Sequence, residues 1–421
     1  MAFDTAVSGL QSASAELGVI GNNIANSATT GFKTSRAEFS DLYASGLLGS
    51  GSNAIGRGVS LSAVSQQFTQ GNISFTENSL DVAINGNGFF ILNDSGTEVF
   101  TRAGQFGIDR DGFVVNNEGL RLQAFQSDTA GAILPSIGDL QLDTGLIEPQ
   151  ATTQAEIVSN LDSRESVPVT AWGGPFDAFA TPPTAPTADM YNNSTSTTVF
   201  DSLGNPHILS TYYVKSATAN QWQAYTLVDG VSTSGPETLQ FDQAGALDPS
   251  GGVTSLTITG WAPLNSDGTP SGALAQNFTV DVSQTTQFGS NFAVSNINQN
   301  GFTSGQLRGV EIDPTGVVFA QYNNGQSRAL GQVVLAGFSN TQGLQPQGGS
   351  IWTETFSSGP PTRNPAGDGG LGVLQSGALE DSNVEVTEQL VAMIVAQRNF
   401  QANAQVIQTE DAVTQAVINL R

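Results

Sequence analysis

Two aspartates in the segment DRDG, residues 109–112, are the first candidates for metal chemistry in this sequence. Asp109 and Asp111 have the spacing of the first two ligands in a calcium-binding loop. Val114 and Val115 stand where further oxygen ligands should follow, and their side chains cannot bind a cation. The segment is therefore predicted to be a turn between two strands.

A glycine-rich segment, NGNG at residues 85–88, is a candidate for holding phosphate. Phosphate loops use backbone N–H groups at the N-terminus of a helix. This segment instead lies between two strand-like runs, DVAI at residues 81–84 and FFIL at residues 89–92. A tight hairpin is predicted here, without a nucleotide site.

His207 is the sole histidine, and cysteine is absent. One histidine cannot supply a Ser-His-Asp triad with a spare base, or a two-histidine metal site within one chain. The absence of cysteine excludes disulfides, thiol catalysis and thiolate zinc sites, and no Gly-x-Ser-x-Gly motif occurs. The 37 acidic residues contain no recognisable glycosidase pair. We therefore expect no enzyme activity, no cofactor and no metal, and interpret His207 as a hairpin residue after Pro206.

The charge balance excludes two further classes of function. The formal net charge is −24, and Lys33 and Lys215 are the only lysines, so no basic patch can form for nucleic acid or an anionic membrane. No stretch is apolar enough for membrane insertion. The N-terminus has Asp4 and a heptad pattern where a cleaved signal peptide would have a basic start and an apolar run. If the protein works outside the cell, it is expected to leave without such a signal.

The two ends of the chain are predicted to be helical. Residues 378–421 contain no Gly or Pro, although the chain has 48 Gly and 17 Pro, and Ser382 with Glu385 would form a capping box. Apolar residues recur in both ends at spacings of three and four or their multiples. They are Phe3, Val7, Leu10, Leu17 and Ile24 with Ala6, Ala13 and Ile20 beside them, then Val386, Leu390, Met393, Phe400, Ala404 and Ile407. Stripes this narrow need a partner helix.

The middle of the chain is strand-like and rich in glycine. Short apolar runs from Leu80 onward indicate an antiparallel β domain, and a second strand-rich region, with a candidate hairpin at residues 196–214 and 222–228, is inserted into it. The predicted fold is multi-domain and mainly β, with terminal α-helical coiled-coil segments and nested, discontinuous domains. The predicted parts are a terminal helical domain (1–33 and 380–421), extended Gly-rich linkers (34–75, with strand pairing near 59–68, and 355–379), an inner β domain (76–157 and 289–354) and an inserted outer β domain (158–288).

Three motifs resemble bacterial flagellar rod and hook proteins. The segment GNNIANSATTGFK, residues 21–33, is similar to the N-terminal signature of that family. LDVAINGNGFF, residues 80–90, and FTRAGQF, residues 100–106, are similar to its shared β domain. These motifs indicate the family as a whole.

The hook branch of the family is indicated by VFDSLGNPH at residues 199–207, by ALGQVVLAGF at residues 329–338 and by residues 377–421. Rod relatives are shorter and lack so large an inserted β region. The resemblance implies a structural subunit of the flagellar hook, a self-assembling curved tube that joins the motor's rod to the filament as a universal joint. It also implies export to the extracellular flagellum without a cleaved signal peptide. The implied partners are further copies of the chain, the hook cap, distal rod and hook–filament junction proteins, and the flagellar export apparatus.

The terminal segments are expected to form the assembly interface, because stripes too narrow to be buried within one copy can be buried between copies. The expected interface residues are Phe3, Val7, Leu10, Leu17, Ile20, Ile24, Asn26, Gly31, Phe32, Val386, Leu390, Met393, Ile394, Phe400, Ile407 and Leu420. The alternatives are a stable two-helix hairpin within one copy, a distal rod protein, and an extracellular β-rich adhesin or hydrolase. Polar breaks at Gln397 and residues 410–411 weaken the hairpin alternative.

Overall fold

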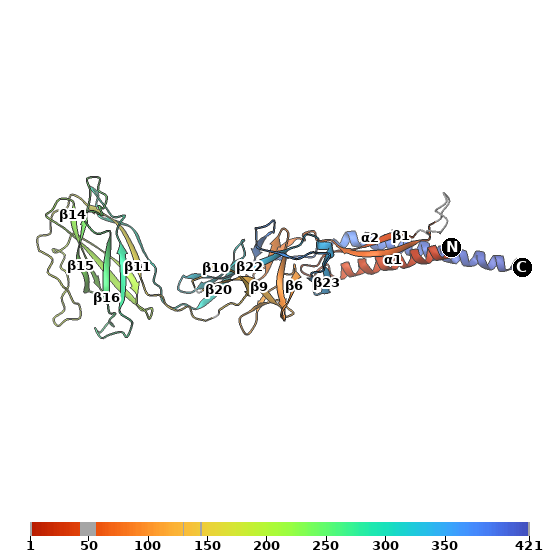
Figure 1. Ribbon diagram of the computed structural model, residues 1–421, viewed down its shortest axis with the longest axis horizontal. Coiled ribbons are helices and arrows are strands. Elements are labelled where there is room, and N and C mark those ends of the chain that lie inside the picture. Colours follow the sequence, from red (N-terminus) through yellow and green to blue (C-terminus); the bar gives the residue numbers. More distant parts are fainter. Residues whose placement is uncertain (1, 43–55, 129, 144, 420–421) are drawn as a thin grey trace. The chain divides into compact units, whose positions relative to one another are not determined.

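The computed structural model describes residues 2–42, 56–128, 130–143 and 145–419. These residues form two compact units: unit 1 from residues 1–144, 308–321 and 327–421, and unit 2 from residues 145–307 and 322–326. Strands predominate in both units, and both long helices lie in unit 1 (Figure 1). The predicted fold class, mainly β with terminal helices, is confirmed. The predicted outer domain falls within unit 2, and the domain boundaries themselves stay predictions.

Unit 1 is built around a large sheet whose strands come from both halves of the chain. They are β5 (Phe89–Asp94), β6 (Thr97–Thr101), β7 (Gly107–Ile108), β8 (Val114–Val115), β9 (Arg121–Ser127), β10 (Ile133–Asp139), β20 (Leu307–Ile312), β21 (Val317–Tyr322), β22 (Ser327–Gly337), β23 (Gln345–Gly348), β24 (Ile351–Thr353) and β25 (Thr362–Pro365), with a short 3-10 helix η1 (Thr341–Gly343). The main order is β20-β21-β22-β9-β5-β6-β24-β23. Phe89, Phe100 and Trp352 form its core, and Phe68 and Phe338 make edge-to-face ring contacts there.

Three two-stranded ladders complete the β structure of unit 1. β1 (Ser35–Asp41) pairs with β2 (Val59–Gln66), β3 (Ile73–Phe75) with β27 (Ala378–Glu380), and β4 (Val82–Asn85) with β26 (Val373–Ser376), all antiparallel. The segments expected to be extended linkers therefore contain hydrogen-bonded strands. Residues 43–55 of the first linker lie outside the described residues.

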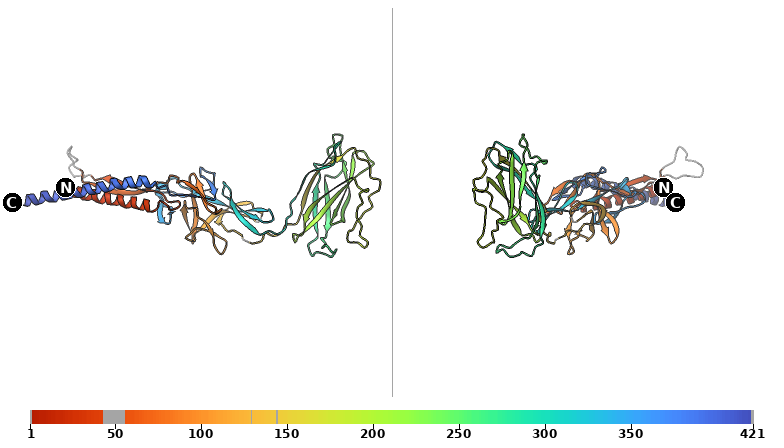
Figure 2. Two further views of the ribbon diagram at one scale, coloured as in Figure 1. Left: turned by 180° about the vertical axis from the view of Figure 1, so that it is seen from behind. Right: turned by 60° about the vertical axis from the view of Figure 1, so that its left-hand side comes forward.

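The helices α1 (Ala2–Ala25) and α2 (Val386–Asn419) lie side by side, and the β1–β2 ladder runs along α1 (Figures 1 and 2). The prediction that helix extends back to Ala378 is wrong, because residues 378–380 pair with β3 as strand β27. The predicted capping box is also wrong. Helix α2 begins after Glu385, and Ser382 Oγ instead accepts a hydrogen bond from the N–H of Val384 at 3.3 Å.

Unit 2 is a sandwich of two sheets (Figure 1). Its strands are β11 (Gln154–Asp162), β12 (Asn193–Phe200), β13 (Pro206–Lys215), β14 (Gln221–Val228), β15 (Val231–Gln240), β16 (Ser255–Trp261), β17 (Gln276–Asp281), β18 (Thr286–Phe288) and β19 (Ala293–Gln299). One sheet has the order β16-β17-β11-β18 with β19 paired to β11, and the other is β12-β13-β14-β15. Side chains from both sheets, such as Ile157 and Trp222, share one core. The predicted hairpin is confirmed by the antiparallel pairs β12–β13 and β13–β14.

The two segments considered as binding loops are turns. Asp109 Oδ1 accepts hydrogen bonds from the N–H groups of Asp111 and Phe113, both at 2.8 Å, which closes the predicted turn between β7 and β8. Residues 85–88 connect β4 to β5, but these strands belong to different sheets, so the predicted hairpin is wrong. Positive φ angles of 119° at Gly86 and 124° at Gly88 redirect the chain from one sheet into the other.

Candidate assembly site

Helices α1 and α2 pack against each other in antiparallel orientation. At one end, a Cβ added to Gly9 would come within 2.6 Å of Asn403 Oδ1, so the two helices are in close contact there. Towards the other end, Asn23 Nδ2 donates a hydrogen bond to Gln389 Oε1 at 3.0 Å. With this register, the last residues of α2 continue past the first turn of α1 (Figure 1).

The buried face of α1 follows the predicted heptad spacing. Ala6, Ala13 and Ile20 are buried at seven-residue intervals. Val7, Leu10, Leu17 and Ile24 are half-buried, and Phe3 is exposed. The small side chains of the alanines allow close approach of the neighbouring elements, whereas the larger residues of the predicted stripe are only partly covered.

On α2 the predicted stripe divides into two groups. Ala396 is fully buried, and Met393, Phe400 and Ile407 are half-buried at heptad-like spacing from it, in line with the residues that touch α1. The second group, Val386, Leu390 and Ile394, is 42%, 47% and 50% exposed. Leu420 lies outside the described residues. One copy of the chain therefore covers only part of the apolar surface of α2.

The remaining predicted interface residues lie where the chain leaves α1. Asn26 Nδ2 donates to Asn22 O at 2.9 Å, and Phe32 is half-buried. Gly31 has a φ of 68°, and a Cβ added there would lie 2.5 Å from the backbone nitrogen of Ala103. Only glycine fits this position without moving the backbone. Its N–H donates to the backbone oxygen of Glu380 at 2.8 Å, which joins the two ends of the chain.

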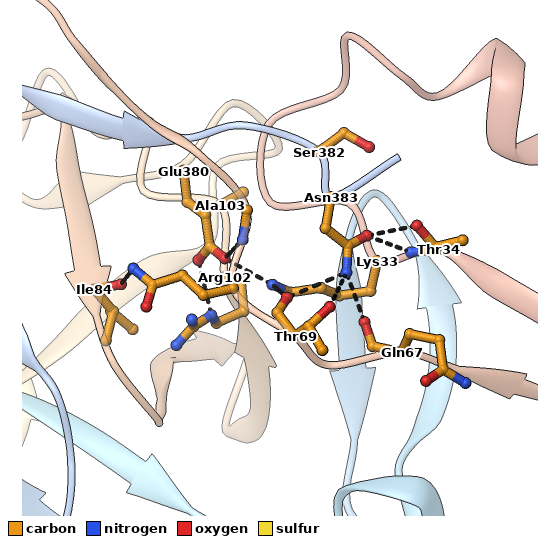
Figure 3. Close-up of polar contacts among 12 residues, drawn as sticks. Lys33, Thr34, Gln67, Thr69, Ile84, Arg102, Ala103, Glu380, Ser382 and Asn383 are labelled. Carbon is orange, nitrogen blue, oxygen red and sulfur yellow. Dashed lines mark hydrogen bonds and ion pairs between the residues drawn. The ribbon is translucent and has the colours of Figure 1, made fainter. Parts of the chain in front are cut away.

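Three buried charged side chains, which we call the ionic anchor, close this junction (Figure 3). Lys33 Nζ lies 2.7 Å from Glu380 Oε1, and Arg102 Nε forms an ion pair with Glu380 Oε2 at 2.9 Å. The side chains of Lys33 and Glu380 are 0% exposed and that of Arg102 is 4% exposed. Lys33 follows α1, Arg102 follows β6, and Glu380 ends β27, so the anchor joins both chain ends to the β structure of unit 1.

Backbone groups satisfy the other hydrogen bonds of the ionic anchor. They are Lys33 Nζ to Thr69 O (2.7 Å), Arg102 Nη1 to Gly88 O (2.7 Å), Arg102 Nη2 to Gly86 O (2.9 Å) and Gly71 N–H to Glu380 Oε1 (2.9 Å). Buried charges require such partners. The glycine-rich segment 85–88, considered above as a phosphate loop, thus binds a guanidinium through its carbonyl oxygens.

Two cations share one carboxylate in the ionic anchor. The pKa of Lys33 lies below its ordinary value of 10.5, chiefly because burial disfavours the ammonium form; Glu380 raises it and Arg102 lowers it. Lys33 therefore holds its proton less strongly in the folded protein than in the unfolded chain. The positive charge of Lys33 is a cost to folding that Glu380 only partly offsets.

Two asparagines fasten the helix ends to the same junction. Asn383 Oδ1 accepts hydrogen bonds from the N–H and hydroxyl of Thr34, both at 2.7 Å, and Asn383 Nδ2 donates to Gln67 O at 2.8 Å (Figure 3). Asn23, which is 1% exposed, donates to Ser35 O at 2.8 Å and accepts from Ser35 N–H at 2.9 Å. The start of α2 and the end of α1 are thus both tied to the base of the β1–β2 ladder.

Sequence reasoning did not identify the ionic anchor. Arg102 and Glu380 occur in the motifs that resemble the flagellar family, but neither motif indicates that its charge is buried. The one available signal was Lys33, which is one of only two lysines. Its partner Glu380 is 347 positions away, beyond the reach of any local pattern.

Unit 2 has a charged cluster of its own, in which buried His207 and Asp201 meet the partly exposed Asp229. His207 Nδ1 lies 2.6 Å from Asp229 Oδ2, and His207 Nε2 lies 3.4 Å from Asp201 Oδ2. The hydrogen bond to Asp229 is the largest cause that raises the pKa of His207 above 6.5, and burial opposes it. Across the part of the chain that the structure describes, no group of three or more His, Cys, Asp or Glu side chains could hold a metal ion.

Sequence comparison finds known flagellar domains in four segments of the chain, including both ends. The matching families are the flagella basal body rod protein (residues 3–33), the flagellar hook protein FlgE/F/G D1 domain (83–160), the flagellar basal body protein FlaE D2 domain (160–302) and the flagellar basal body rod FlgEFG protein C-terminal domain (375–420). Neither helix, over its described residues, has the length and hydropathy needed to cross a bilayer.

Full-length relatives are hook proteins. The flagellar hook protein FlgE of Salmonella typhimurium is 38% identical and that of Escherichia coli K12 is 39% identical, and each alignment covers 100% of both chains. The crystal structure of the flagellar hook protein FlgE2 of Helicobacter pylori has a similar fold, with a TM-score of 0.54 at 14% identity over 73% of this chain and 100% of that chain. This chain belongs to the flagellar hook protein family.

Proposed function

We propose that this chain is the structural subunit of a bacterial flagellar hook and that copies assemble through α1 and α2. The observation that supports this most directly is the apolar surface of α2 that α1 leaves open, at Val386, Leu390 and Ile394. Exposed apolar patches that follow one helix face mark protein interaction sites. A second copy of the chain can bury this surface, and the helix pair then gains stability on assembly.

The proposed assembly is a curved tube that lies outside the cell and acts as a universal joint between the motor's rod and the filament. Membership of the hook family supports this role. The same membership suggests contacts with the hook cap, distal rod and hook–filament junction proteins, and delivery by the flagellar export apparatus without a cleaved signal peptide. We assign the chain no enzymatic activity and no nucleic-acid or membrane partner.

A distal rod protein is the second candidate, because the families matched at both chain ends include rod proteins. The match of residues 160–302 to the FlaE D2 domain favours the hook. The full-length similarity to flagellar hook proteins disfavours an extracellular adhesin or hydrolase.

Electron microscopy of the concentrated protein tests the proposal. We expect curved tubes; straight tubes would indicate a rod protein, and protein that stays monomeric would contradict assembly altogether. Leu390→Asp should abolish the tubes, because a charge in a buried seam is costly. The β-sheet circular dichroism should be unchanged. Val169→Asp is the matched control, since Val169 is 99% exposed in unit 2.

A further inference from the structure

Unit 2 covers several edges of its two sheets with its own chain. An uncovered edge strand presents N–H and C=O groups that can pair with another chain. At the edge strand β15, Thr238 O accepts a hydrogen bond from the N–H of Val253 at 2.8 Å, and Pro236 lacks an N–H. At β18, the N–H of Gln287 donates to Gly245 O at 2.8 Å. Neither strand is therefore free to pair along its whole length.

The edge strand β12 lacks this protection. Its sequence, NSTSTTVF, contains no charged residue, no Pro and no Gly, and its pairing with β13 has no register shift. Edge strands usually avoid pairing with other chains through charges, Pro or bulges. Ser194, Ser196 and Thr198 are exposed, and Thr195 and Thr197, on the opposite face of the strand, are only half-buried. Strand β12 is therefore accessible along most of its length.

The hydrogen bonds of Phe200 show which backbone groups of β12 face outward. Its N–H donates to Thr152 Oγ1 at 2.9 Å, and its carbonyl oxygen accepts from the N–H of Thr152 at 3.0 Å, so both groups point away from β13. Because backbone groups alternate along a strand, those of Ser194, Ser196 and Thr198 also point outward. No hydrogen bond from another described segment reaches the backbone of these three residues, which we call the open edge.

A second uncovered edge, that of β16, lies on the other side of the sandwich. Strand β16 lies against β15, and β15 and β12 are opposite edges of one sheet. Thr254 O accepts from the N–H of Val282, next to β17, at 3.0 Å, so the backbone groups of Ser255 and Thr257 point outward by alternation. Over the described residues, no other segment bonds to these groups. Strand β16 is also uncharged, and its regular pairing ends at Ile258.

We propose that the open edge pairs with β16 of a second copy, at Ser255 and Thr257, in antiparallel orientation. Main-chain hydrogen bonds then join a sheet of one copy to a sheet of the next. Unit 2 is acidic, with Arg164 and Lys215 as its only Arg or Lys, so two copies repel least where both strands are uncharged. The inference rests on the proposed function, because it specifies how the second units of neighbouring copies meet within the assembly.

The positions of two carboxylates favour the antiparallel orientation. Glu165 Oε1 accepts from Asn193 Nδ2 at 2.9 Å at the start of β12, and Asp281 is paired with Ser255 at the start of β16. Antiparallel pairing places these carboxylates at opposite ends of the contact, whereas parallel pairing would bring them together. Strands β12 and β16 are different surfaces, so their contact can continue from copy to copy, while β12 against β12 would end at a dimer.

Cysteine cross-linking tests which strands meet, because the natural chain has no cysteine. Ser196→Cys or Thr198→Cys protein is mixed with copies that carry Ser255→Cys or Thr257→Cys, assembled and oxidised. Residues directly opposite each other in an antiparallel pair are close enough for a disulfide. We expect disulfide dimers that contain one copy of each kind, from at least one of these pairs, in tubes and not in dilute monomer. Val169→Cys in place of the β16 variant should give none.

The outcomes separate this inference from the proposed function. Tubes that form without any β12-to-β16 dimers, or that give β12-to-β12 dimers, would overturn the strand pairing and leave the hook assignment intact. Wild-type protein that forms no tubes would overturn both.

A proline in the open edge provides a second measurement. Ser196→Pro removes one outward N–H, and strands tolerate Pro at edge positions whose N–H faces solvent, so the melting transition of unit 2 should be retained. The loss of one hydrogen bond between copies should raise the critical concentration for tube formation by about threefold to tenfold. Ser196→Ala is the matched control, because it keeps the N–H and should leave the critical concentration unchanged. Equal critical concentrations for the two variants would contradict the proposal.

Discussion

The ionic anchor of unit 1 is fully buried and the His207 cluster of unit 2 is largely buried, and these two charged clusters connect the chain in different ways. Lys33 and Glu380 are 347 positions apart, whereas His207 is 22 positions from Asp229 and 6 from Asp201. The anchor can form only when both chain ends have reached the β structure of unit 1. The His207 cluster needs only a neighbouring hairpin and turn. The ionic anchor therefore couples the folding of the two chain ends of unit 1. The His207 cluster instead stabilises one short segment of unit 2, residues 201–229.

The largest effect expected from this comparison is for Glu380→Gln. The substitution leaves Lys33 and Arg102 buried without a carboxylate, and removal of one partner from a buried ion pair costs about 3–5 kcal/mol. Calorimetry should show a lower melting temperature for unit 1 and an unchanged transition for unit 2.

Lys33→Met sharpens the same test. It removes one of two cations, keeps the Arg102–Glu380 pair neutral and approximately fills the volume of the lysine side chain. We expect a smaller loss of stability than for Glu380→Gln. If Lys33→Met destabilises unit 1 as much as Glu380→Gln does, the charge balance of the anchor does not explain its stability.

A smaller effect is expected at Gly31, which brings the end of α1 to the anchor. Gly31→Ala places a side chain on a left-handed residue and against Ala103, so we expect a loss of at least about 1–2 kcal/mol in unit 1. Gly21→Ala is the matched control, because no atom lies within 4 Å of its added Cβ and it lies inside α1. That change should stabilise the helix by about 0.5–1 kcal/mol. Equal effects at the two glycines would rule out a special conformation at Gly31.

The smallest effect is the pH dependence of unit 2. The pKa of His207 is raised on folding, so its contribution to stability is complete below the unfolded value of 6.5 and is lost as the pH rises through the folded pKa. The melting temperature of unit 2 should fall over this interval. His207→Gln should flatten the decline, and NMR of the single histidine gives its pKa directly. A decline of equal size in His207→Gln would exclude His207 as its source.

Local patterns in the sequence predicted the features of this protein that are themselves local. Helical spacing identified Met393, Phe400 and Ile407, which line up with the buried Ala396, because a helix sets its own periodicity. The turn at Asp109 was predicted for the same reason, since its side chain bonds to the next few N–H groups.

Features that depend on distant partners could not be predicted. Residues 378–380 could have continued α2, and only their pairing with β3 makes them a strand. A tight hairpin was predicted at residues 85–88, but the strands on either side pair with different neighbours. Arg102 and Glu380 look like surface charges in the sequence, and only the closure of the chain ends buries them together. Which distant segments pair with each other decides these features, and local sequence preferences do not determine that pairing.

The positions of the two lysines determine which chemical cross-linkers can fix assembling copies of this protein to one another. Lys33 is enclosed by the ionic anchor. Lys215 Nζ lies 5.6 Å from the ring centre of Trp222 and donates a hydrogen bond to Ser163 O. Aldehydes and succinimidyl esters react with free amines. Lys33 is buried, and Lys215 is half-buried and hydrogen-bonded, so both should react less readily than an exposed lysine. Carboxylates are abundant instead, with 37 acidic residues in the chain. Carbodiimide coupling to an added diamine is therefore the chemical fixation suited to this surface.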